Sequence, residues 1–158
     1  SFVICEYVCA RFPGAAASKL LPPPGQARAD VQKWVSVEAT EMRPHILKPY
    51  KERVLKKLKG LGEPDEAVVE QGRQDTAKVL DVLEAHLAAT PGGHLTGANF
   101  TLADVGFMPY LQALSDAKCG DLLEARPNVA AWWERCRTRP TWQATVALVK
   151  EARFTYKK

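Results

Sequence analysis

The side chains that could do chemistry in this chain are four cysteines and three histidines. A thiolate is a nucleophile and a metal ligand, and a histidine can act as a base or bind zinc. The cysteines form no Cys-x-x-Cys pair, and the histidines have neither metal-site nor catalytic-triad spacing. We therefore expect reduced cysteines that act as small hydrophobes, histidines at the surface or at helix caps, and no metal site. These residues are Cys5, Cys9, Cys119, Cys136, His45, His86 and His94.

Cys5 and Cys9 are the pair to weigh for catalysis, because they lie four residues apart and share one face of a short helix. A reactive thiol needs solvent access and surroundings that lower its pKa. We expect this helix to pack against the rest of the protein, so we expect neither thiol to be a nucleophile. Reduced cysteines are typical of the cytosol, and we expect a cytoplasmic protein.

The segment from Phe100 to Val105 predicts the start of a helix. Thr101 stands at the N-cap and Asp104 at the third helical position, so each side chain can accept a hydrogen bond from the other residue's amide. Phe100 and Val105 flank the cap at the spacing of a hydrophobic staple. We therefore predict that Thr101 and Asp104 form a structural capping box.

The composition excludes several classes of protein. The 158 residues are 46% hydrophobic and 25% charged, which is typical of one globular domain with a real core. The net charge is only +4, and the densest lysine group, within 48–59, has few aromatic residues on which bases could stack. No stretch approaches the roughly 20 apolar residues of a membrane span. We expect no nucleic-acid partner and no membrane span.

Apolar spacing predicts helices throughout the chain and no strand. Residues 2–12 form the first, and Pro13 and Gly14 end it. Residues 13–25 are expected to be a non-helical connection, because their three consecutive prolines cannot continue a helix. A long helix over about 27–58 contains Pro44 and Pro49, and each proline should bend it. The remaining predicted helices span 65–89, 101–115, 121–125, 128–138 and 141–152, which gives an all-α domain.

Six segments resemble, in order, those of the glutathione transferase superfamily, and of its plant phi class in particular. Together they cover nearly the whole chain. They are Gln32 to Glu38, Met42 to Pro44, Asp65 to Val69, Lys78 to Glu84, Leu95 to Asp104, and the stretch with Arg126-Pro127-Asn128-Val129, Trp132-Trp133 and Arg139-Pro140.

This resemblance implies a transferase C-terminal-like helical bundle. Residues 1–12 would be the last helix of a thioredoxin-like domain that is otherwise largely absent, residues 13–25 an interdomain linker, and residues 26–158 the helical C-terminal domain. Ser1 matches the family's serine that holds the γ-glutamyl end of glutathione. The resemblance places the catalytic serine, which favours the glutathione thiolate, in the missing part, so the chain itself carries no catalytic residue.

The implied activity is conjugation of glutathione to hydrophobic electrophiles in detoxification, with glutathione as a co-substrate, no cofactor, and a homodimeric protein. Met42, Ile46 and Tyr50 recur on one stripe of the first long helix, and we predict that they contact the hydrophobic substrate. Interior packing of all three is the alternative. The alternative function is a non-catalytic, transferase-like module for binding or assembly.

Overall fold

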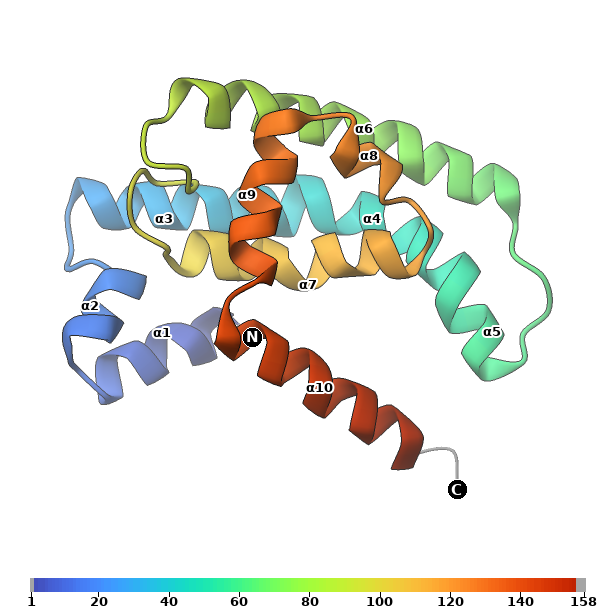
Figure 1. Cartoon of the computed structure of the whole chain (residues 1–158), viewed down its shortest axis with the longest axis horizontal. Coiled ribbons are helices and arrows are strands. Elements are labelled where there is room, and N and C mark those ends of the chain that lie inside the picture. The colour runs from blue at the N-terminus through green and yellow to red at the C-terminus, as the bar shows by residue number, and fades with distance from the viewer. Residues whose placement is uncertain (1, 156–158) are drawn as a thin grey trace.

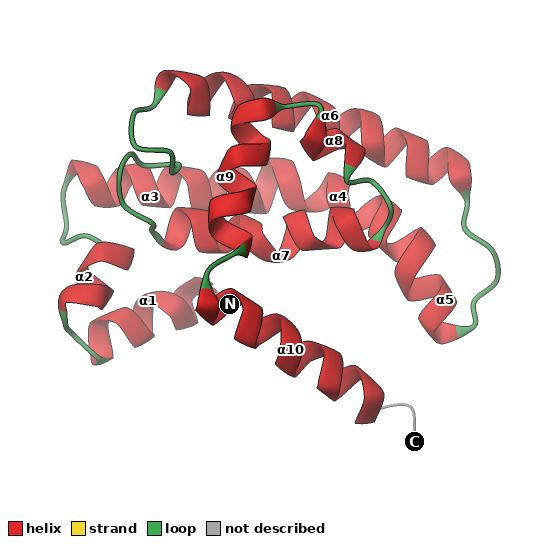
Figure 2. Cartoon of the chain, in the orientation of Figure 1, coloured by secondary structure: helices red, strands yellow, loops and turns green. Residues whose placement is uncertain are grey.

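The computed structural model describes the backbone of residues 2–155, without the side chains of residues 15, 16, 18, 150 and 152–155. Among these residues every regular element is a helix, and His94 and Gly97 form an isolated β-bridge (Figure 2). The all-α prediction is therefore confirmed. None of the described helices combines the length and the apolar character that a membrane crossing needs. The helices are α1 (Phe2–Arg11), α2 (Ala15–Leu20), α3 (Gln26–Val37), η1 (Glu38–Met42), α4 (Arg43–Tyr50), η2 (Lys51–Leu55), α5 (Lys56–Lys59), α6 (Glu66–Ala89), α7 (Leu102–Asp116), α8 (Asp121–Glu124), α9 (Pro127–Arg137) and α10 (Pro140–Thr155).

The first long helix is a continuous run from α3 to α5 that contains two π-helical turns, η1 and η2. The Arg43 amide donates to the Glu38 carbonyl, and the Lys56 amide donates to the Lys51 carbonyl, each across five residues. Pro44 lies two residues after the end of the first π turn, and Pro49 lies two residues before the start of the second. A wider turn relieves the clash between a proline ring and the turn before it, so the first π turn helps to accommodate Pro44 inside the long helix, whereas Pro49 lies within α4. Figure 1 shows α5 turning away from the line of α3 and α4.

The expected non-helical connection of residues 13–25 is wrong in one part, because it contains the short helix α2. Proline restricts only the end of this segment, and the alanine-rich stretch before it is free to form a turn of helix. Leu21, which precedes Pro22, has the extended backbone (φ −134°, ψ 97°) that a residue before proline prefers. The helix therefore ends where the prolines begin.

Helix α4 packs between α6 and α7, and α9 contacts both α6 and α7 (Figure 1). Asp65 caps α6 by accepting hydrogen bonds from the amides of Ala67 and Val68, at 3.0 and 3.2 Å. Phe107 of α7 meets Trp132 of α9 edge to face, with ring centroids 5.8 Å apart. α10 diverges from the bundle below the other helices. The largest fully buried side chains include Trp132, Phe107, Met42, Ile46, Leu80, Leu83, Leu95, Leu111 and Leu114.

Candidate functional site

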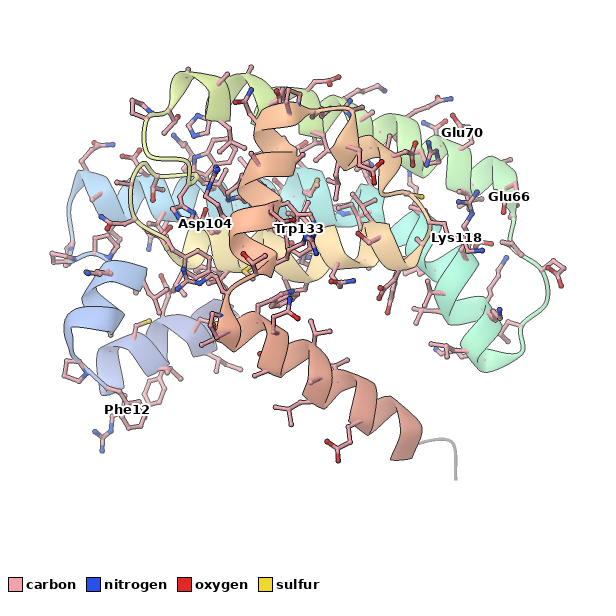
Figure 3. The ribbon with its side chains drawn as sticks, in the orientation of Figure 1. Phe12, Glu66, Glu70, Asp104, Lys118 and Trp133 are labelled. Carbon is pink, nitrogen blue, oxygen red and sulfur yellow. The ribbon has the colours of Figure 1, made fainter. Side chains whose placement is uncertain are left out.

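Asp104 is the centre of a buried hydrogen-bond network that ties three segments together. Its side chain, at the start of α7 beside α9 (Figure 3), is fully buried. It accepts hydrogen bonds from the Thr101 amide at 2.8 Å, the Leu95 amide at 3.1 Å and the Trp132 indole at 2.8 Å. The first of these belongs to the capping box of Thr101 and Asp104, which is present in the structure. The network fixes the loop before α7 and the crossing helix α9 at one point.

The environment of Asp104 favours its charged form. Burial alone would raise the pKa of this carboxyl. The neighbouring His94 ring, the two backbone amides and the Trp132 indole outweigh burial and hold the pKa of Asp104 below its ordinary value. The Thr101 hydroxyl adds a fourth hydrogen bond, at 3.3 Å, so the acceptor sites of this carboxylate are taken up by the protein itself.

His94, Asp104 and Cys136 bring three metal-ligand types within 4.8 Å of one another, a grouping that the sequence did not reveal. The donors do not fit a metal. Burial raises the pKa of the Cys136 thiol to about 12, so it keeps the proton that a metal would have to displace. The Asp104 oxygens already accept from Leu95, Thr101 and Trp132. The hydrogen bonds of this cluster therefore stabilise the fold.

The cysteines of the first helix are less buried than those of the bundle. Cys5 and Cys9 are half-buried on α1, whereas Cys119 and Cys136 are buried, and all four are free thiols. Burial, followed by the neighbouring Cys5, raises the pKa of Cys9. A raised pKa disfavours the thiolate, as expected for a thiol that is not a nucleophile.

An apolar groove of about 350 Å³ lies between α4, α7 and α10. Each helix presents one stripe to it, because its lining residues recur at steps of three and four along the chain. α7 and α10 contribute most of the wall, and α10 closes one side. The lining residues are Leu47 and Tyr50 of α4, Pro109, Tyr110, Gln112, Ala113 and Asp116 of α7, and Trp142, Thr145, Val146 and Val149 of α10.

The predicted substrate-contacting residues differ in their access to the groove. Met42 and Ile46 are fully buried in the core at 0% exposure, so in this conformation they cannot touch a ligand. Tyr50 lines the groove. The two π turns were not foreseen, but they lie on either side of the stretch from Arg43 to Tyr50, which is α-helical. Ser1 lies outside the described residues. The apolar spacing of Trp142, Val146 and Val149 is a sequence signal for this wall of the groove. Nothing in the sequence indicates that the wall faces α7.

One wall of the groove is held by an ion pair between a buried carboxylate and a partly exposed guanidinium. Glu38 is only 2% exposed and accepts two hydrogen bonds from the Arg43 guanidinium, at 3.0 and 2.7 Å. The Arg43 guanidinium carbon lies 5.3 Å from the centre of the Tyr110 ring. Glu38 therefore fixes Arg43, and Arg43 covers one face of Tyr110.

A family model described as "Glutathione S-transferase, C-terminal domain" matches residues 33–140. Glutathione S-transferase 3 of Zea mays is 37% identical, covering 94% of this chain and 65% of that protein. Glutathione S-transferase F14 of Arabidopsis thaliana is 31% identical, covering 83% of this chain and 52% of its own length. The chain thus spans about half to two thirds of the length of these relatives.

Solved structures give the same result. The apo form of glutathione S-transferase III superposes with a TM-score of 0.80 at 37% identity, over 92% of this chain and 65% of that one. Glutathione S-transferase I from maize, in complex with an atrazine glutathione conjugate, superposes with a TM-score of 0.83 at 28% identity, over 94% of this chain and 67% of that one. The helical bundle therefore has the same fold as the corresponding part of these structures.

Proposed function

Because this chain belongs to the glutathione S-transferase superfamily, in its phi class, we propose that it supplies the hydrophobic-substrate half of an enzyme that conjugates glutathione to apolar electrophiles. In this reaction the glutathione thiolate sulfur forms a bond to the electrophilic carbon. With an aryl halide, the halide leaves with the bonding electrons and the thiol proton passes to solvent. Glutathione is a co-substrate, and the reaction needs no further cofactor.

The apolar groove between α4, α7 and α10 carries this proposal. Pockets for small apolar molecules are concave and largely hydrophobic, with a few polar groups that orient the ligand. The groove has aliphatic and aromatic walls and two tyrosines, Tyr50 and Tyr110. A superposable relative is known with an atrazine glutathione conjugate. We place the electrophile in this groove, with Tyr50 in contact and with Met42 and Ile46 packed in the core outside its lining.

We also propose the domain division that the resemblance implies. Residues 1–12 end a thioredoxin-like domain, residues 13–25 connect the domains, and residues 26–158 form the helical domain. α1 has no fully buried residue, and the exposed apolar side chains of Ile4 on α1 (65%) and of Phe12 just after it (66%) suit a helix that packs against a further domain. Phe12 points away from the bundle (Figure 3). Ser1 would bind glutathione, and the catalytic serine would belong to that further domain.

The assembly and compartment follow the same proposal. We place α6 near the two-fold axis of a homodimer, and its exposed Val68 and Val82 give it apolar contacts to offer a partner. Four free thiols suit the reducing cytoplasm. A non-catalytic binding module remains the second candidate, since the groove alone would serve it equally well.

The test uses the longest natural protein that contains this chain and follows conjugation of glutathione to 1-chloro-2,4-dinitrobenzene. We expect activity, and we expect Val146→Trp, which fills the groove from α10, to raise KM for the aryl halide several-fold without changing KM for glutathione. Ala144→Trp is the matched control, because residue 144 is exposed and lies about 200° around the same helix from residue 146. Binding of aryl compounds without any conjugation would favour the binding module.

A further inference from the structure

The Tyr110 hydroxyl is a polar group of the groove whose hydrogen-bonding capacity the fold leaves unused. The Gln112 side-chain amide donates to the Asp116 carboxylate at 3.0 Å, and the Thr145 hydroxyl donates to the Thr141 carbonyl at 2.9 Å. Tyr50 has an interaction of its own as well. The Tyr110 hydroxyl, by contrast, makes no hydrogen bond with any residue from 2 to 155 whose side chain the structure describes.

The Tyr110 ring is also held in place. The Arg43 guanidinium lies 5.3 Å from its centroid, and the buried Glu38 carboxylate fixes that guanidinium through two hydrogen bonds. A ring fixed before the ligand arrives loses little rotational freedom on binding, which strengthens the contact its hydroxyl then makes. Burial, followed by the charge of Glu38, raises the pKa of Tyr110, although Arg43 opposes this effect. The phenol therefore keeps its proton at neutral pH and can donate a hydrogen bond.

We propose that the Tyr110 hydroxyl is the polar anchor of the groove and that it selects apolar ligands carrying a hydrogen-bond acceptor, such as a carbonyl, nitro or ether oxygen. The inference rests on the proposed function, because it names the class of electrophile that the groove takes. The apolar walls bind the hydrocarbon part, and the phenol orients the ligand through its acceptor. Tyr110 is thus a specificity-determining residue.

Two ligands of nearly the same shape test this selection. Benzophenone carries a carbonyl where 1,1-diphenylethylene carries a methylidene group, so only the first can accept a hydrogen bond. Binding of each to the 158-residue chain is measured by calorimetry and by the fluorescence of the groove residue Trp142, with Trp142→Phe to identify that signal. We expect Tyr110→Phe to weaken benzophenone binding about fivefold and to leave diphenylethylene binding unchanged.

The matched control is Tyr7→Phe, which removes the same hydroxyl from an exposed position on α1 outside the groove. It should change neither affinity. Equal affinities of Tyr110→Phe and the unmodified chain for benzophenone would overturn the anchor while leaving the groove as the binding site. An equal loss for both ligands would overturn it too, because that loss would reflect packing. Failure of both ligands to bind the unmodified chain would overturn the groove, and the proposed function's placement of the electrophile with it.

Discussion

Gly72 of α6 lies so close to Pro49 of α4 that a Cβ atom on residue 72 would come within 2.6 Å of the proline Cδ atom. The same Cβ would stand 2.8 Å from the Lys48 Cβ atom. Neither neighbour is the end of a flexible side chain, so the two helices would have to move apart. Glycine at this position is what lets the two longest helical runs pack at close range.

Gly72→Ala should therefore lower the free energy of unfolding by about 1–3 kcal/mol, the range for overpacked interiors. The better helix propensity of alanine would offset about 1 kcal/mol at most. Chemical denaturation gives the difference, and Gly120→Ala is the control, because a Cβ there meets no atom within 4 Å. A Gly72→Ala midpoint equal to that of the control would show that the helices have room to spare.

Asp104→Ala should destabilise the chain by about 2–4 kcal/mol, because it removes a cap and leaves several buried donors unpaired. The stranded groups are the amides of Leu95 and Thr101 and the Trp132 indole. Trp132 is fully buried, so its near-ultraviolet circular dichroism should weaken at the same time. An unchanged denaturation midpoint would contradict the central role of this carboxylate.

The same carboxylate predicts a dependence of stability on pH. The pKa of Asp104 is lower in the folded protein than its ordinary value of 3.8, so the unfolded chain binds the proton more readily. Its contribution is therefore complete above about pH 4 and is lost as the pH falls through the folded-state pKa. The stability difference between the unmodified chain and Asp104→Asn should be constant from pH 7 to about 5 and shrink below about 4. A difference that grows on acidification would reverse the sign of this linkage.

Glu84 of α6 caps the N-terminus of a different helix, α9. Its carboxylate accepts from the Asn128 amide at 3.2 Å, the Asn128 side chain at 2.7 Å and the Val129 amide at 2.9 Å. Glu84→Ala should cost about 1–2 kcal/mol, as for loss of an N-cap. Glu63→Ala, at an exposed loop position, controls for the change in net charge. In Glu84→Ala, amide hydrogen exchange should become faster in the first turn of α9. Exchange rates there equal to those of the unmodified chain would argue against the cap.

The Glu38–Arg43 pair gives the last prediction. Arg43→Ala leaves a nearly fully buried carboxylate without its partner, which should cost about 3 kcal/mol. The double variant Glu38→Gln with Arg43→Met removes the buried charge as well and should recover most of that loss. If the double variant were as unstable as Arg43→Ala alone, packing of the arginine stem rather than the charge would explain the cost.

Local signals predicted most of the helices. The expected helix at 65–89 is found as Glu66–Ala89 with Asp65 as its cap, because caps, glycines and prolines act on neighbouring residues. Contacts between residues far apart in the chain could not be predicted from the sequence. Nothing in a single sequence places Glu84 at the start of α9, or brings Cys136 to Asp104. The stripe of Met42, Ile46 and Tyr50 was real as a pattern, but its burial depends on which helices cover it.

The π turn at Glu38–Met42 also has a consequence for how this family can vary in length. A π turn holds one residue more than the α turn it replaces. A relative that lacks one residue here would close the segment into an ordinary turn and leave α4 seated in the bundle as before. Homologues should therefore differ by single insertions or deletions at this turn, inside a buried helix, where such changes are otherwise poorly tolerated. An evolutionary record of that kind would be found by aligning the helices by structure rather than by sequence alone.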